Sequence, residues 1–209
     1  MKDQNFEREL PVGYTQRLHI NAKSLKMGVI LNLVALAVLA LVLAVAAIPL
    51  VLEDDVSFAI DPIVLLIAYA VFFVSMILYI VLHEAVHGIA YKSMTGEKLT
   101  FGMSWSCAFC GVPNIYTYRR TALVALAAPL VTFTVILLPI TVALYCVHPL
   151  FYLAATSLFG LHLGGCSGDG YMLILLLTKY KSPALLMRDT GPEQFLYLPE
   201  GENDRETSN

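Results

Sequence analysis

The sequence predicts an all-α polytopic membrane protein with about four transmembrane helices and a small cytoplasmic β-hairpin-like loop between the second and third helices. Of its 209 residues, 58% are hydrophobic and only 14% are charged, whereas soluble domains average about 25% charged residues. The mean hydropathy is +0.72. Four apolar segments also reach the roughly 20 residues needed to cross about 30 Å of hydrocarbon. Composition and segment length therefore both favour a membrane protein.

The first two predicted spans lie in the N-terminal half of the chain, at residues 27–52 and 61–91. The first is almost entirely Leu, Val and Ala. The second begins at Asp61-Pro62, where Asp suits the N-cap of a helix and Pro suits its first turn. Both spans are therefore expected to be helices that remain in the membrane.

The third and fourth predicted spans cover residues 121–147 and 149–178. Pro129 and Pro139 lie inside the third, where proline is expected to kink a helix. The fourth is interrupted by several glycines, namely Gly160, Gly164, Gly165, Gly168 and Gly170. The glycines around Asp169, from Gly164 to Gly170, could let another helix approach closely, with the helix of the second span as the expected partner. The alternative is a flexible break in the span.

The distribution of Lys and Arg predicts the orientation of the chain. They occur in the arm at residues 1–26, in the loop at 93–120 and its borders, and in the tail at 179–209. The other two connections contain neither, and the first carries Glu53, Asp54 and Asp55. Because Lys and Arg accumulate on the cytoplasmic side, both termini and the loop are expected there, flanking a four-helix membrane domain at 27–178. No basic cluster of the kind that binds nucleic acid is present.

His83, Glu84 and His87 form an H-E-x-x-H motif inside the second span. On a helix, positions i and i+4 share one face, so both imidazoles can reach one metal ion. Glu84 lies about 100° around the helix from His83, near a water on that metal. Ionisable groups inside a span are costly and mark functional sites. The alternative is a polar cluster that joins two helices by hydrogen bonds.

A catalytic zinc usually has three protein ligands and one open position, so a third ligand is expected. Among the carboxylates after His87, Asp169 is the one that falls inside a predicted span. At 1.5 Å per residue, His87 lies about 7 Å and His83 about 13 Å from the cytoplasmic end of their helix, and Asp169 about 15 Å from the end of its own. The matching depths favour Asp169 as the ligand. A hydrogen-bonding Asp that packs helices is the alternative.

His162 lies seven residues before Asp169 on nearly the same face, about 10 Å deeper. We consider it a rival metal ligand or a substrate contact, with a hydrogen-bonded packing histidine as the simpler interpretation. His162 is a candidate because it is an ionisable residue inside the apolar fourth span.

The cytoplasmic loop alternates apolar and small or polar residues over 99–109, which is typical of a strand. Residues 111–114 resemble a turn, and 115–118 can return as a second strand. The exposed edge of such a hairpin can bind an extended peptide. The alternative is a hairpin that only covers the helix ends. Cys107 and Cys110 form C-x-x-C, but no second pair completes a zinc site and no thioredoxin-like context surrounds them.

The motif and the later Asp-Gly make the chain resemble the site-2-protease class of intramembrane metalloproteases. More closely, it resembles a family of small multi-pass membrane proteins described as putative zincin peptidases. The resemblance is carried by residues 83–88, 127–130 and 168–170. It implies one zinc ion held by His83, His87 and Asp169, with Glu84 as the general base. Residues 161–168 lack the Asn and Pro that site-2 proteases have before Asp-Gly, so the group that stabilises the oxyanion is unassigned.

These observations predict a zinc-dependent membrane-embedded endopeptidase that cleaves peptide bonds at or near the cytoplasmic face of the cell membrane. Its expected partners are the lipid bilayer and a membrane-protein or peptide substrate. Two alternatives stay open. A catalytically degenerate homologue would bind zinc and act as a binding partner, and a small metal or ion carrier would use the same ligands transiently. A carrier is expected to show internal repeats, and the sequence shows none.

Overall fold

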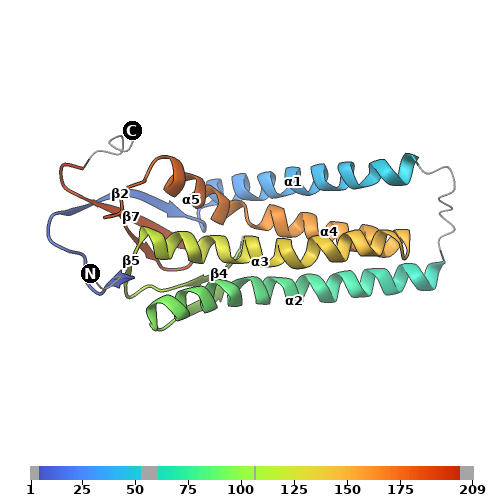
Figure 1. The fold of residues 1–209 in the computed structure, drawn as a ribbon, viewed down its shortest axis with the longest axis horizontal. Coiled ribbons are helices and arrows are strands. Elements are labelled where there is room, and N and C mark those ends of the chain that lie inside the picture. The colour runs from blue at the N-terminus through green and yellow to red at the C-terminus, as the bar shows by residue number, and fades with distance from the viewer. Residues whose placement is uncertain (1–4, 53–60, 106, 203–209) are drawn as a thin grey trace. The chain divides into compact units, whose positions relative to one another are not determined.

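The computed structural model describes residues 5–52, 61–105 and 107–202. Its helices are α1 (Leu25–Leu52), α2 (Pro62–Thr95), α3 (Arg119–Tyr145), α4 (Pro149–Gly165) and α5 (Ser167–Thr178), as labelled in Figure 1. Helices α1, α2 and α3 are long and apolar enough to cross a membrane. The acidic residues 53–55 that entered the orientation prediction lie outside the described residues.

The fourth predicted span is interrupted among its glycines. Helix α4 ends at Gly165, α5 begins at Ser167, and the pair is bent by 44° at this break. Together the two helices could make one broken span. By contrast, α3 runs through Pro129 and Pro139 as one helix.

The prediction of an all-α protein is wrong, because the polar arm and tail form strands. The strands are β1 (Phe6–Glu7), β2 (Tyr14–Asn21), β3 (Thr100–Met103), β4 (Ala108–Gly111), β5 (Tyr116–Tyr118), β6 (Leu186–Asp189) and β7 (Glu193–Pro199). Five of them build an antiparallel sheet in the order β1-β5-β6-β7-β2. Strands β2 and β7, from opposite ends of the chain, lie side by side (Figure 1). The arm and tail are thus parts of a mixed fold.

The chain divides into two compact units, which are described separately below. The sheet unit comprises Met1–Ile30, Glu84–Pro129 and Gly168–Asn209. The helical unit comprises Leu31–His83 and Leu130–Ser167. The boundary within α2 falls between His83 and Glu84, inside the H-E-x-x-H motif.

The core of the sheet unit forms where apolar side chains of the sheet meet those of the helices. Met187 and Leu196 from the sheet pack with Leu126 of α3 and Leu176 of α5, and all four are at most 2% exposed. Alternate residues of β7 are buried, because successive side chains of a strand point to opposite faces. Burial of this apolar surface explains why the arm and tail are ordered around the helix ends.

One carboxyl group is buried in this core, at Asp189 of β6. It accepts hydrogen bonds from the Tyr91 hydroxyl, at 2.7 Å, and from the Gly191 N–H, at 2.8 Å. Burial raises the pKa of Asp189 to about 6, because a buried carboxylate loses its hydration. The two hydrogen bonds offset part of that cost, and the bond from Tyr91 ties β6 to α2.

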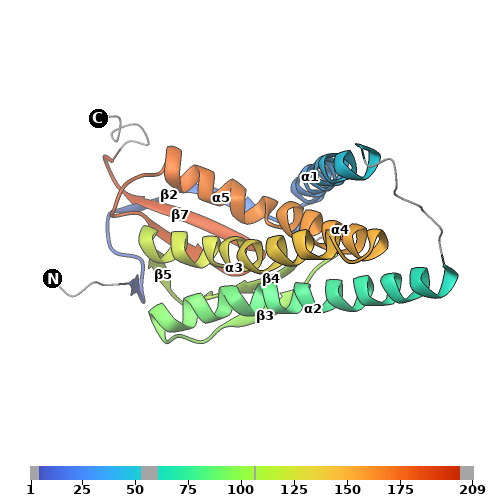
Figure 2. The ribbon, with the colours of Figure 1, turned by 45° about the vertical axis from the view of Figure 1, so that its right-hand side comes forward.

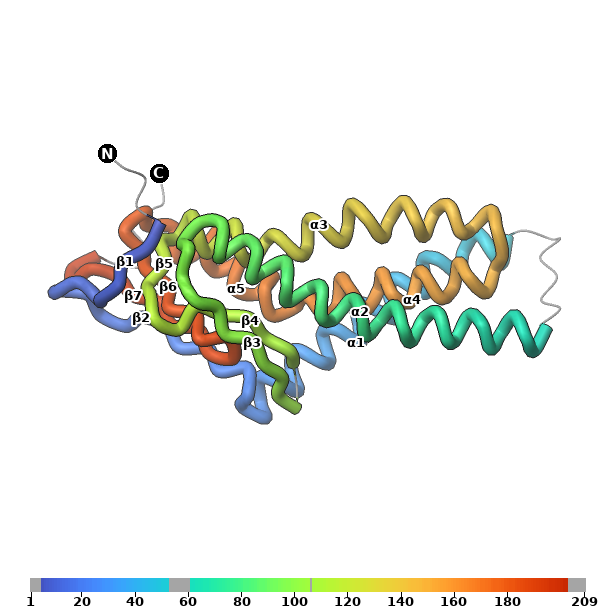
Figure 3. Tube along the Cα trace, turned by 90° about the horizontal axis from the view of Figure 1, so that it is seen from below, coloured from blue at the N-terminus to red at the C-terminus, as the bar shows by residue number. Residues whose placement is uncertain are grey.

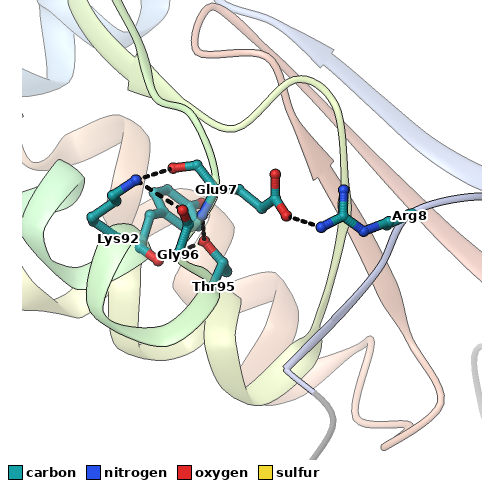
Figure 4. A network of polar contacts seen from close by, with 6 residues as sticks. Arg8, Lys92, Thr95, Gly96 and Glu97 are labelled. Carbon is teal, nitrogen blue, oxygen red and sulfur yellow. Dashed lines mark hydrogen bonds and ion pairs between the residues drawn. The ribbon is translucent and has the colours of Figure 1, made fainter.

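The end of α2 is joined to the N-terminal arm by a small polar network (Figure 4). Lys92 Nζ donates to the carbonyl oxygens of Gly96, at 2.8 Å, and Glu97, at 3.2 Å. Gly96 has φ +69°, the left-handed conformation in which glycine commonly ends helices. The Glu97 carboxylate then accepts from Arg8 at 2.6 Å. The network therefore fixes the segment beside β1 against the helix that carries the motif.

The loop between α2 and α3 contains a hairpin, but its strands differ from those predicted. Strands β3 and β4 pair with Phe101 opposite Cys110, and they run beside the last turns of α2 (Figure 3). The continuous strand expected over residues 99–109 is broken by a turn. In that turn the Ser104 N–H donates to the Cys107 carbonyl at 2.7 Å, and the Cys107 N–H donates to Ser104 Oγ at 3.2 Å. The predicted second strand exists as β5, which pairs with β1 and β6 instead.

The C-x-x-C pair of this hairpin gives no sign of redox chemistry. Cys110 is buried, and burial raises the pKa of its thiol to about 12. A reactive cysteine needs thiolate character at neutral pH. Cys110 lies in β4 and Cys107 in the turn before it, so the expected strand pattern holds for Cys110 but not for Cys107.

In the helical unit, glycines of α4 allow close packing against α1 (Figure 2). A Cβ atom added at Gly164 would lie 2.6 Å from the Ala35 carbonyl oxygen, and one at Gly160 would lie 2.7 Å from the Leu39 side chain. Small residues permit this approach between helix backbones. The expectation that the glycines around Asp169 face the helix carrying His83 is thus wrong for Gly164, which faces α1, whereas a Cβ at Gly165 would lie 3.8 Å from the Tyr79 hydroxyl of α2.

We expect Gly164→Ala to lower the free energy of unfolding by about 1–3 kcal/mol, the usual cost of overpacking. The matched control is Gly170→Ala, since a Cβ there meets nothing within 4 Å. Alanine is favoured over glycine in helices by about 1 kcal/mol, so the control should be neutral or stabilising. Thermal unfolding of the two variants in detergent tests this, and equal stabilities would contradict the close packing.

Candidate metal centre

Helix α2 carries the three residues of the motif without interruption. Its first turn is capped by Asp61, whose Oδ1 accepts from the Ile63 N–H at 2.8 Å as predicted. Because α2 is continuous through residues 83–87, His83 and His87 lie one turn apart on the same face. Both are buried, at 7% and 6% exposure. Glu84 is half-buried.

In the sheet unit, His87 lies against Asp169, which is in the first turn of α5. His87 Nε2 is 3.2 Å from Asp169 Oδ2. The other ring nitrogen, Nδ1, is 2.9 Å from the Ala125 carbonyl oxygen of α3. A carbonyl can only accept, so the Nδ1 proton makes this bond and Nε2 is the nitrogen that can bind a metal. The structure therefore brings together two of the residues identified by depth and motif.

This pair has the geometry of two ligands of one zinc ion. Zinc binds His nitrogen and carboxylate oxygen at about 2.0–2.1 Å, which places two ligand atoms of a tetrahedral site about 3.3 Å apart. The observed 3.2 Å agrees with that spacing. The hydrogen bond to Ala125 is also the outer contact that usually orients a ligating histidine. The residues present thus fit zinc.

Glu84 is placed for a role beside this pair. Its carboxylate interacts electrostatically with His87 of the same helix and with Cys110 of β4. A carboxylate one residue from a ligand can face the metal's open position without binding the metal. Glu84 is therefore the candidate proton acceptor.

In the helical unit, His83 and His162 both contact Tyr79. The Tyr79 hydroxyl is 2.8 Å from His83 Nδ1 and 3.0 Å from His162 Nδ1. His162 Nε2 is 3.0 Å from Thr134 Oγ1. His162 is fully buried, and besides these two hydroxyl groups it contacts Cys166 Sγ, at 3.7 Å, and the backbone of Leu130.

The helical unit also contains a second group that could hold a metal. Its members are His83, His162 and Cys166, with one donor atom of each within 4.8 Å of the others. Sequence reasoning missed Tyr79 and Cys166. Tyr79 is four residues before His83, and Cys166 is four residues after His162. This i, i+4 spacing, which places side chains on one helix face, was the available signal.

Comparison with known proteins identifies the family. A family model described as "Putative zincin peptidase" matches residues 76–185, more than half of the 209 residues. The chain belongs to this family. The matched segment includes the whole H-E-x-x-H motif, His162 and Asp169. Membership supports a zinc-dependent peptidase and implies zinc as the metal. No match was found among curated proteins or among solved structures.

Proposed function

We propose that the protein is a membrane-embedded zinc endopeptidase of the site-2-protease type, with one zinc ion held by His83, His87 and Asp169. The observation that carries the proposal is the His87–Asp169 pair. Its donor atoms come from two separate helices and lie 3.2 Å apart, and the histidine is oriented by Ala125. The motif spacing on α2 supplies His83 as the remaining ligand.

Glu84 moves the protons of the reaction. Zinc, when bound, supplies a Lewis acid that makes water acidic near pH 7. Glu84 accepts the proton of the attacking water and then delivers it to the nitrogen of the leaving amine. The carboxylate is thereby regenerated, and one water is consumed for each peptide bond cleaved.

The location of the reaction follows from the helix that carries the motif. Helix α2 has the length and hydropathy of a membrane span, and its motif lies toward the end that the Lys and Arg pattern assigns to the cytoplasm. We infer that peptide bonds are cleaved at or near the cytoplasmic face of the cell membrane. The substrates would be membrane proteins or peptides, and the bilayer is the surrounding partner.

Extended peptides could bind at the hairpin beside the motif. Strand β3 pairs with β4 along one edge, and Phe101 and Met103 of β3 are exposed. An exposed strand edge recognises an extended peptide through main-chain hydrogen bonds. An extended backbone is also the conformation that peptidases need for access to the scissile bond. The hairpin is thus our proposed substrate contact.

The proposed topology places both termini in the cytoplasm after four crossings. Reporter fusions after Asp54 and after Asn209 should then report opposite sides of the membrane, because Lys and Arg are retained on the cytoplasmic side. The broken pair α4–α5 must count as one crossing for this result. Reporters on the same side would overturn the topology.

A comparison of membrane proteomes between wild-type and Glu84→Gln cells tests the proposed activity. Proteins that are shortened only in wild-type cells would be substrates or lie downstream of one, since Gln keeps the shape of Glu but cannot act as a base. The two alternatives, a non-catalytic zinc-binding partner and a metal or ion carrier, predict no Glu84-dependent cleavage. Identical peptide patterns from the two strains would favour those alternatives.

A further inference from the structure

Four side chains of the helical unit, three buried and one half-buried, form a continuous hydrogen-bonded chain that ends at His83. The order is Thr134 of α3, His162 of α4, Tyr79 of α2 and His83 of α2, with successive contacts of 3.0, 3.0 and 2.8 Å. Tyr79 and His162 are 8% and 0% exposed. Because buried polar groups must be paired, this arrangement needs a defined direction of hydrogen bonding.

Metal binding at His83 would set that direction. Tyr79 contacts Nδ1, so a metal would be held through Nε2, and the ring proton would then lie on Nδ1 and be donated to the Tyr79 oxygen. The Tyr79 hydroxyl would donate onward to His162 Nδ1. His162 would carry its proton on Nε2 and donate it to Thr134 Oγ1. Every contact in the chain then has one donor and one acceptor.

We propose that Tyr79 and His162 are positioning residues that fix the tautomer and ring orientation of His83 for zinc. The inference rests on the proposed zinc site and extends it beyond the ligands. It gives His83 an outer partner at Nδ1, as Ala125 is for His87. Such outer partners typically contribute 10–100-fold to metal affinity.

The packing around this hydrogen-bonded chain explains why loss of the Tyr79 hydroxyl should have a strong and local effect on zinc affinity. The His83 ring is stacked on Phe133, with an interplanar angle of 12°, and lies edge-on to Tyr79. Phe133 is 7% exposed. Water therefore has little access to replace a lost hydroxyl, and an unpaired buried N–H is expensive. Removing the Tyr79 oxygen would leave His83 Nδ1 and His162 Nδ1 without their shared partner.

A rival interpretation is that His83, His162 and Cys166 bind a metal of their own. Cys166 Sγ is 3.7 Å from His162 Nδ1, and one donor atom of each residue lies within 4.8 Å of the others. However, the Tyr79 hydroxyl lies within hydrogen-bond distance of both Nδ1 atoms, so a metal bound through these two atoms would have to displace it. The positioning role requires no change in these contacts, so we favour it.

The test is metal titration of the full-length protein in detergent after chelator treatment, using Zn²⁺ and Co²⁺. Tyr79→Phe should raise the zinc dissociation constant by about 10–100-fold and shift the visible spectrum of bound Co²⁺. The matched control is Tyr152→Phe. Tyr152 is equally buried, and its hydroxyl donates to the Ala46 carbonyl at 3.1 Å, away from His83. The control should leave zinc affinity and the spectrum unchanged.

A second pair of variants separates loss of the hydrogen bond from misfolding of the protein. His162→Gln keeps an amide that can accept from Tyr79, so it should bind zinc more tightly than His162→Leu. Wild-type affinity in Tyr79→Phe, or equal affinity in the two His162 variants, would overturn the positioning role. In that case, loss of zinc in Asp169→Ala would show that the proposed function stands although the positioning role does not. Two metals per chain, or a thiolate-to-cobalt band removed by Cys166→Ser, would overturn the proposal in favour of a second metal site.

Discussion

Glu84→Gln should lower the rate of peptide cleavage by about 10²–10⁴-fold, the usual contribution of general acid–base catalysis, while zinc stays bound. Gln preserves the size of the side chain and its ability to form hydrogen bonds, but it cannot take a proton from water. Glu84 is half-buried and interacts electrostatically with His87. The carboxylate is therefore positioned for proton transfer beside the ligands.

Cleavage of a membrane-segment peptide by purified protein, assayed with zinc content, measures this effect. Glu97→Gln is a suitable control, because Glu97 follows the same helix but pairs with Arg8 at 2.6 Å. It should cleave at the wild-type rate. A Glu84→Gln protein with full activity would assign the base elsewhere, and one that lost its zinc would make Glu84 a ligand.

His83→Ala and His87→Ala should each weaken zinc binding by more than the 10–100-fold expected for loss of an outer contact. Each change removes one of three protein ligands of a catalytic zinc site. His87→Ala also leaves the Asp169 carboxylate without its partner at 3.2 Å. Removing one partner of a largely buried charge pair is destabilising, so His87→Ala should also reduce stability in the metal-free state.

Competition with a zinc-binding dye gives the dissociation constants for these two variants. His19→Ala serves as the matched control, since His19 lies in β2 and stacks on Phe195. It should retain wild-type zinc affinity. Unchanged zinc binding in either motif variant would refute the assigned ligand set.

The helices could be predicted from the sequence because their signals are local. Length and hydropathy located α1, α2 and α3 within about two residues of their observed starts and ends, except at the C-terminal end of α2. The sheet could not be predicted in the same way. Its longest pairing joins residues 14–21 to 193–199, and such long-range pairing leaves only a weak alternation in each strand. The polar arm and tail are therefore predicted only as cytoplasmic segments, without strands.

The site was predictable to a similar extent. The motif spacing and the depth of Asp169 each depend on one helix at a time, and the structure does bring Asp169 beside His87. The contact between Tyr79 and His162 joins residues 83 positions apart, and a tyrosine in an apolar span does not by itself indicate such a contact. Likewise, the small residues at Gly160 and Gly164 indicated close packing, but not that α1 would be the partner.

The zinc content of the purified full-length protein, compared between wild type, Asp169→Ala and His162→Ala, tests the central claim most directly. A site held by His83, His87 and Asp169 predicts about one zinc per chain in wild type and loss of most of it in Asp169→Ala. His162→Ala should keep most of its zinc at the concentrations used for purification, because a 10–100-fold weaker site still fills there. Full zinc in Asp169→Ala together with its loss in His162→Ala would contradict the account.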